Sequence, residues 1–496
     1  MVPSADFWAP FILPLYMKHL AQSFAGMGGG YVLECLLQGG LTLCLLTLLL
    51  GRRRHGVAVY LLGAMVVAMA MLPFNIGSVV MARSGSLVFA GVYNRLGGAL
   101  IMLALLVPVV REDRSRDGLL MLWMACLLSL AFLVKVTVFQ IVLVLGGGYG
   151  LLCKDWRWLR VMLMATVVSV ALLAVLLLST GMWDGYLSAL REVSAVRMSL
   201  MHERLDISRE TLVNHRLECF VLLFCGLLAA ARGHFLRIDW AGLVLWYLLS
   251  CVMIILFMLT NFGDNGLFPS VGALFALVSL QSRAGLMARL ASSTGRRYAR
   301  ALKWASEGVL ALILVGYVVV NVIWGWSFMQ TQQRADLIHF PVSTTFFSNH
   351  HLIEREAWES RIPLHVPGVP RNMQSPSTFA DYVEGLDEAE RFLEEHVPDR
   401  GRSVYALDFP SYVFAMAGGY RVPRGTYPWL LFGHELSIDV HPKAEVLLAD
   451  VDVLMVSKCS LATGNRRYLV RLYRQDIERR WTRLGALRCW DVYRKR

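Results

Sequence analysis

A succession of long apolar segments in the first two thirds of the chain constrains the fold more than any other feature of the sequence. A helix needs roughly 20 residues to cross about 30 Å of hydrocarbon, because it rises about 1.5 Å per residue. About ten segments come near this length, at 31–50, 57–74, 96–110, 119–134, 136–153, 161–182, 217–231, 240–260, 267–280 and 309–328. The sequence therefore predicts a polytopic α-helical membrane domain of about ten spans at 1–329 and a C-terminal soluble α/β domain at 330–496.

The composition agrees with a membrane protein. The 496 residues are 56% hydrophobic and only 17% charged, which is too apolar for a soluble protein of this length. The arginines behind the net charge of +12 mostly fall in short clusters between apolar segments. Such clusters are typical of cytoplasmic loops, so we expect no nucleic-acid partner.

The basic clusters also give an orientation. They fall in alternate loops, at 52–54, 111–116, 154–160, 232–237 and 283–303, which we assign to the cytoplasm. The loops at 75–95, 183–216 and 261–268 are less consistently basic and lie outside by alternation. The segment 6–21 and the C-terminal domain then lie outside as well, which is the periplasm if the membrane is a bacterial inner membrane.

The C-terminal domain has the pattern of a small open α/β layer fold. Helices are expected at 377–397 and 468–481, and strands at 404–409, 451–456 and 489–493. Cys459 and Cys489 lie beside neighbouring strands in an oxidising compartment, so we predict that they form a disulfide. The sequence has no paired C-x2-C spacing of the kind that binds a metal.

The segment 6–21 precedes the first apolar segment and differs from it in character. Asp6 opens it, and Pro10 and Pro14 disfavour a continuous helix through it. Its aromatic and polar residues predict a loop that lies on the membrane surface.

Four ionisable residues lie in or near the apolar segments: Glu34, Arg95, Lys135 and Glu218. A charge at the bilayer centre costs about 2.5–3.5 kcal/mol, so it is retained only for a reason. Lys135 joins two spans on the outer side, where it either meets an anionic head group or extends its amine to the interface. Glu34 and Gln38 are one turn apart and share a face, for which pairing between helices is the expected role.

Two outer segments contain further candidates. Tyr93, Asn94 and Arg95 stand where an outer loop enters a span, and arginine suits bidentate contacts with phosphate. The alternative is that these residues anchor the helix at the interface. The loop 183–216, which contains Arg197, has charged residues among apolar ones at helical spacing, and this pattern predicts an amphipathic helix on the outer leaflet.

Taken together, these features resemble the GT-C class of polytopic glycosyltransferases, nearest to the bacterial relatives of protein mannosyltransferases and aminoarabinose transferases. Asp6-Phe-Trp-Ala-Pro followed by Pro14-Leu-Tyr is similar to the D-F-x-S-P…P-L-Y segment of their first periplasmic loop. The resemblance implies transfer of a sugar from a polyprenyl-phosphate donor to a glycan, lipid or protein acceptor. For this chemistry Asp6 is the candidate catalytic base, and the candidate substrate-binding residues are Tyr93, Asn94, Arg95, Lys135 and Arg197.

The sequence departs from that class at its start. Members usually have a further membrane helix before this loop and an acidic residue where the loop begins, whereas Met1 here stands only a few residues before Asp6. Either the chain starts further upstream, or the element is lost, or Asp6 has taken over the role. No resident cofactor is expected, and the use of a divalent metal stays open.

A non-catalytic polytopic protein, such as a transporter or a structural partner in a cell-envelope polysaccharide system, is the competing class. Transporters tend to show paired halves with interrupted helices at the midplane, and no internal repeat is found here. The polar residues instead gather at the outer ends of spans. This distribution favours a site at the membrane surface over a translocation path.

Overall fold

A computed structural model describes most of the helical region and most of the C-terminal domain. The described ranges are 12–51, 57–71, 92–110, 117–184, 241–260, 337–339, 351–353, 376–408, 411–426, 436–459 and 468–496, with a few single residues between them. All structural statements below refer to these residues.

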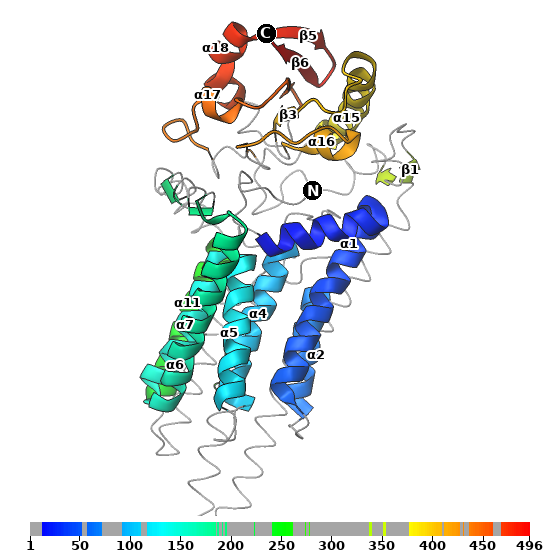
Figure 1. Cartoon of the computed structure of the whole chain (residues 1–496). Coiled ribbons are helices and arrows are strands. Elements are labelled where there is room, and N and C mark those ends of the chain that lie inside the picture. Colours follow the sequence, from blue (N-terminus) through cyan, green and yellow to red (C-terminus); the bar gives the residue numbers. More distant parts are fainter. Residues whose placement is uncertain are drawn as a thin grey trace, which may run out of the picture.

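Seven helices form a bundle (Figure 1). They are α1 (Ile12–Leu50), α2 (Val57–Met71), α4 (Val92–Val110), α5 (Asp117–Val134), α6 (Val136–Leu152), α7 (Trp156–Ser179) and α11 (Ala241–Thr260). Seven of the expected spans coincide with these helices. The spans expected at 217–231, 267–280 and 309–328 lie outside the described residues, apart from the single helical residues Leu223, Ala273 and Leu277.

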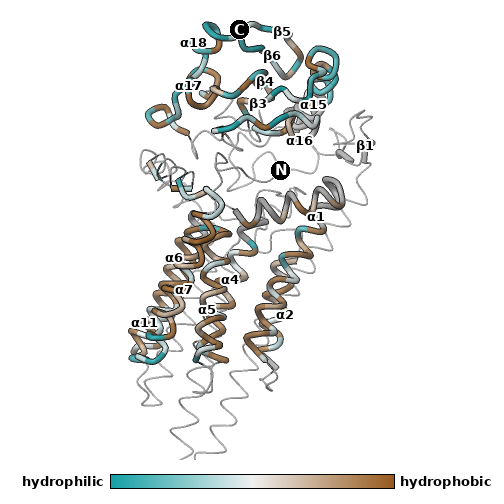
Figure 2. The backbone as a smooth tube through the Cα atoms, in the orientation of Figure 1, coloured by the Kyte–Doolittle hydropathy of each residue, from teal (hydrophilic) through white to brown (hydrophobic). Residues whose placement is uncertain are grey.

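Three of the described helices are long and apolar enough to cross a membrane, with the qualifying segments Leu33–Leu50, Asp117–Val134 and Trp156–Ser179. Four shorter apolar helical segments accompany them: Val59–Ala68, Arg95–Val110, Val136–Leu152 and Ala241–Phe257. The protein is therefore a helical membrane protein, and a total of about ten spans stays a prediction. Figure 2 shows the apolar residues following these helices along their length.

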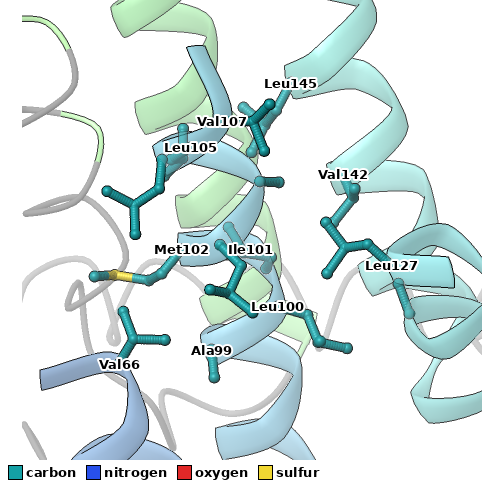
Figure 3. Packing of buried hydrophobic residues seen from close by; sticks show 14 of the residues in the cluster. Val66, Ala99, Leu100, Ile101, Met102, Leu105, Val107, Leu127, Val142 and Leu145 are labelled. Carbon is teal, nitrogen blue, oxygen red and sulfur yellow. The ribbon is translucent and has the colours of Figure 1, made fainter. Parts of the chain in front are cut away.

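The helix α4 is the centre of the bundle. Nearly all its side chains from Leu96 to Val110 are buried, and Figure 3 shows several of them between α2 on one side and α5 and α6 on the other. A helix that is apolar on every side is buried by its neighbours. Arg95, at the start of α4, is therefore enclosed by the neighbouring helices.

The directions of the helices follow from contacts near their ends. Arg157, in the first turn of α7, forms an ion pair with Asp117, the first residue of α5, so both helices start at the same end of the bundle. The chain reverses at Lys135, the single residue between α5 and α6, and α6 runs back. We call the two ends of the bundle the Lys135 end and the Trp156 end.

Tryptophan indoles fasten the helices to one another. The buried Nε1–H groups of Trp123, Trp158 and Trp246 donate to the carbonyl oxygens of Leu45, Gly146 and Leu145 at 2.9, 2.7 and 2.9 Å, respectively. A polar group in an apolar interior is costly unless it has a hydrogen-bond partner. These three bonds therefore fix α5 to α1, α7 to α6, and α11 to α6.

The loop predicted at 6–21 is wrong for its described part, because residues 12–21 are helical and belong to α1. Pro14 is the third residue of α1, in the first turn, where the missing N–H would have no intrahelical partner. The prediction treated both prolines as helix breakers, although proline disrupts a helix only in its interior and is tolerated in the first turn. Figure 1 shows the first part of α1 lying across the Lys135 end and the rest running along the bundle.

The C-terminal unit is α/β, as predicted. Its elements are α15 (Pro376–His396), β3 (Val404–Leu407), α16 (Val413–Gly418), α17 (Ala444–Leu447), β4 (Val453–Ser457), α18 (Val470–Arg480), β5 (Trp481–Ala486) and β6 (Trp490–Lys495). The sheet order is β3-β4-β6-β5, with β3 and β4 parallel and the other pairs antiparallel. Each face of the sheet is covered by its own apolar cluster. A short antiparallel pair, β1 (Leu337–His339) and β2 (His351–Ile353), precedes this unit.

The predicted disulfide is confirmed. Cys459, just after β4, is bonded to Cys489, just before β6, with the two Cα atoms 5.0 Å apart. Because β4 and β6 are antiparallel neighbours in the sheet, the end of β4 lies beside the start of β6, and the disulfide joins the two there.

Candidate functional site

Three charged side chains are buried at the Lys135 end of the bundle. Glu34 of α1, Arg95 of α4 and Lys135 are only 4%, 2% and 3% exposed, respectively. A buried charge in a membrane protein is expensive and marks a functional position more often than not. We call these three residues the charge cluster.

Lys135 is placed by the backbone around it. Its N–H donates to the carbonyl of Ala131 at 2.9 Å, and its own carbonyl accepts from the N–H groups of Val138 at 2.9 Å and Phe139 at 3.2 Å. Its backbone is extended, which separates α5 from α6 by one residue. The lysine is therefore fixed at a tight reversal between two helices.

Arg95 meets α1. Its Nη2 lies 3.9 Å from the Sγ atom of Cys35, the neighbour of Glu34 along the chain. One turn further, the Nε2 of Gln38 donates to Oε1 of Glu34 at 3.4 Å. The Oγ1 of Thr42 then donates to the carbonyl of Gln38 at 2.8 Å. Glu34, Gln38 and Thr42 thus form a ladder of polar groups along α1, and Cys35, next to Glu34, contacts the start of α4.

Gly97 brings α4 close to α6. A Cβ atom on Gly97 would lie 2.8 Å from Cγ2 of Val138 and 3.4 Å from Cζ of Phe257 in α11. Gly97 follows Arg95 by two residues, and Val138 follows Lys135 by three, so the two cations lie within about a turn of this contact. The absence of a side chain at Gly97 lets three helices converge beside the charge cluster.

Counted over these three described residues alone, the charge cluster has a net charge of +1 when all are ionised, from two cations and one carboxylate. Arginine offers a planar set of donors and lysine a compact ammonium, and both bind phosphate oxygens. In a low-dielectric site these interactions are stronger than in water. The cluster therefore suits an anion with one or two negative charges better than a cation.

Tyr186 is a candidate that the sequence did not indicate. It lies beyond the span of α7, is 4% exposed, and its ring centroid is 5.1 Å from that of Phe132 near the end of α5. Burial raises the pKa of its hydroxyl, so this group stays neutral and can donate a hydrogen bond. The hydroxyl is buried without a hydrogen-bond partner among the described residues. An isolated tyrosine in an amphipathic loop gave no signal by which to find it.

The structure brings some of the predicted site residues together and leaves others untested. Arg95 and Lys135 lie at the same end of the bundle, and Glu34 and Gln38 share a face, as predicted. The backbones of Tyr93 and Asn94 lie in the first turn of α4, while their side chains lie outside the described part. Asp6 and Arg197 also lie outside the described residues. The contact between Cys35 and Arg95 depends on how α1 packs on α4, which the sequence does not encode locally.

Among the described residues, no group of three or more histidine, cysteine, aspartate or glutamate side chains could hold a metal ion. The fold and the charge cluster together define a helical membrane protein with buried charges at one end of its bundle and a C-terminal α/β unit. Comparisons with family models, with curated proteins and with solved structures find no match to this chain.

Proposed function

We propose that this protein transfers a sugar from a polyprenyl-phosphate donor to an envelope acceptor, which is a lipid, a glycan or a protein. The observation that carries the proposal is the burial of the charged side chains of Arg95, Lys135 and Glu34 at one end of the bundle. The phosphodiester of such a donor has one negative charge. The leaving polyprenyl phosphate gains a second one during the reaction, and buried cations stabilise that developing charge.

The reaction needs two kinds of group. The bond between the anomeric carbon and the phosphate oxygen breaks, its electron pair stays with the phosphate, and an acceptor oxygen forms the new bond to the same carbon. A carboxylate takes the proton of the acceptor. Arg95 and Lys135 are the proposed phosphate ligands, and Asp6 is the proposed base.

The membrane orientation follows from the basic loops. Lys154, Arg157 and Arg160 lie at the Trp156 end, which the positive-inside rule places in the cytoplasm. The charge cluster then faces the periplasm of a bacterial inner membrane. Tyr93, Asn94 and Arg197 are proposed to contact the donor on that side, and Tyr186 is proposed to donate to its sugar or phosphate.

The test is release of undecaprenyl phosphate from donors that carry mannose or aminoarabinose, by the full-length protein in vesicles with envelope extract as acceptor. Lys135→Gln is expected to lower the rate by at least about tenfold, because one charge-assisted contact in the transition state is lost. Lys135→Arg should retain part of the activity. Lys154→Gln is the matched control, since it removes a lysine at the opposite end, and its rate should equal that of the wild type.

The non-catalytic alternative makes a different prediction. The hydrogen bond between Gln38 and Glu34 shows that part of the polar ladder on α1 is internal to that helix, as in a structural polar contact. If the charge cluster only holds helices together, Lys135→Gln will lower the unfolding temperature in detergent while no donor is consumed by any variant. That result would overturn the proposed transfer.

A further inference from the structure

A groove at the Trp156 end is separate from the charge cluster. It has a volume of about 580 Å³ and lies between the first turns of α5 and α7, where its lining includes Asp117, Gly118, Trp156, Arg157, Arg160 and Met164. The 17 residues of α6 separate the groove from Lys135 by about 25 Å, so a head group bound here lies at the opposite end from the charge cluster. The proposed function gives the groove no role.

The groove lies at the depth of lipid head groups. The helix α5 has 18 residues and α7 has 24, and both qualify as membrane spans from their first residue. Eighteen residues extend over about 27 Å, close to the thickness of the hydrocarbon layer. The first residues of both helices are therefore expected at the boundary between acyl chains and head groups, where Trp156, 63% exposed, is a typical residue.

The polar side of the groove favours an anion. Arg157 is paired with Asp117, which cancels one positive charge, and exposed Arg160 adds a second positive charge three residues later on the same helical face. The lining thus has a net charge of +1. The second carboxylate oxygen of Asp117, Oδ1, is buried and accepts no hydrogen bond among the described residues, so it offers an acceptor to a hydroxyl group.

The apolar side of the groove favours a hydrocarbon chain. Met121 of α5 and Val161 of α7 also line it, and Met164 is 53% exposed. The exposed apolar face of α7 extends beyond Met164 through Val167 and Val170, which are 59% and 52% exposed. An acyl chain that starts in the groove can therefore continue along α7 without leaving apolar surface.

We propose that this groove binds an anionic glycerophospholipid of the phosphatidylglycerol type. Its phosphate contacts Arg160 and Arg157, a head-group hydroxyl donates to Asp117, and one acyl chain lies along Met121, Val161 and Met164. Gly118 leaves room for the head group, since a Cβ atom there would meet no other atom within 4 Å. A zwitterionic lipid without hydroxyl donors matches neither the net charge nor the free acceptor oxygen.

The experiment is native mass spectrometry of the full-length protein in detergent, titrated with phosphatidylglycerol or phosphatidylcholine. We expect tighter binding of phosphatidylglycerol. Arg160→Gln should weaken it about fivefold, which is the loss expected for one arginine near a membrane surface. Lys154→Gln removes a positive charge at the same membrane end but outside the groove lining, and it should leave the affinity unchanged.

A second variant tests the contribution of the groove's shape to lipid binding separately from the contribution of its charge. Gly118→Phe fills the groove and keeps every charge, and we expect it to weaken phosphatidylglycerol binding at least as much as Arg160→Gln. Equal losses for Arg160→Gln and Lys154→Gln would show a diffuse electrostatic effect and overturn the site. Equal affinity for the two lipids would overturn it as well, as would preferential binding of undecaprenyl phosphate through Arg160. Each of these readouts is independent of sugar transfer.

Discussion

Gly97 is the residue on which the geometry of the charge cluster most depends. Any side chain there would meet Val138 and Phe257, both of them fully buried. Four other glycines in the bundle mainly meet methionine or leucine side chains, which can move aside: Gly39, Gly63, Gly146 and Gly148. Gly97 is constrained by a short branched side chain and an aromatic ring, which cannot.

We expect Gly97→Ala to lower the free energy of unfolding by about 1–3 kcal/mol, because an extra methyl group in a packed interior forces its neighbours apart. Gly147→Ala is the matched control. Gly147 also lies in a helix, but a Cβ atom there meets nothing within 4 Å, and alanine favours a helix over glycine. Thermal unfolding in detergent should show a lower midpoint for the first variant and an equal or higher midpoint for the second. Equal losses would contradict close packing at Gly97.

The sequence predicted single residues better than contacts. Arg95 and Lys135 could be selected because a charged residue in an apolar segment is evident from the sequence alone. Cys35 and Tyr186 could not, because a cysteine in a span and a tyrosine in a polar loop are ordinary there. The contact of Cys35 with Arg95 depends on helix packing across 60 residues of chain, and the burial of Tyr186 depends on its packing against Phe132.

At the scale of elements, long apolar runs predicted the ends of the described bundle helices to within five residues, except that α1 begins at Ile12 and not near residue 31. Short buried runs predicted β3 and β4. The strand β5 was not predicted, because Trp481 was taken as the end of the preceding helix. The burial pattern of β5 explains the error: only its first residue is fully buried, so the alternation that identifies a strand is absent. Its pairing with β6, a tertiary contact, makes it a strand.

A surface ion-pair network joins the start of β3 to the start of β4. Arg421 binds the carboxylate of Asp450, and this hydrogen bond lowers the pKa of Asp450. Burial raises the pKa of Asp452, but hydrogen bonds from the N–H and hydroxyl of Ser403, with the charge of Arg421, more than offset it. Both carboxylates thus titrate below their ordinary range in the folded state.

The α/β unit should therefore lose stability in acid. A carboxylate with a lowered pKa in the folded state stabilises the fold above its unfolded pKa of about 3.9, and this contribution disappears as the pH falls through the folded pKa. At pH 7, Asp450→Asn should make β4 exchange its amide hydrogens faster than in the wild type, and the difference should vanish once the pH falls below the folded-state pKa of Asp450. Asp439→Asn, at an exposed position, serves as control. A difference that persists in acid would contradict the electrostatic explanation.

At the scale of the whole molecule, the two ends of the bundle differ in chemistry. The Lys135 end has buried charges, while the Trp156 end has arginines and tryptophan at the surface. Figure 1 shows the C-terminal α/β unit beyond the Lys135 end. The proposed orientation assigns the Lys135 end to the outside and the Trp156 end to the cytoplasm.

The orientation can be measured in bacterial cells. Alkaline phosphatase fused after Arg496 should be active, because it folds only outside the cytoplasm, and green fluorescent protein fused at the same position should be dark. The Cys459–Cys489 disulfide agrees with an oxidising compartment around the C-terminal unit. Bright fluorescence with an inactive phosphatase would reverse the orientation and place the charge cluster in the cytoplasm.

The most direct test of the central claim is photo-crosslinking of a diazirine-bearing polyprenyl phosphate to the full-length protein in vesicles, followed by mass spectrometry of the labelled peptides. We predict labels on peptides from the start of α4 and from the α5–α6 junction, competed away by undecaprenyl phosphate and reduced in Lys135→Gln but not in Lys154→Gln. Labels confined to the Trp156 end, or labels at the Lys135 end that survive Lys135→Gln unchanged, would contradict a phosphate site built on the charge cluster.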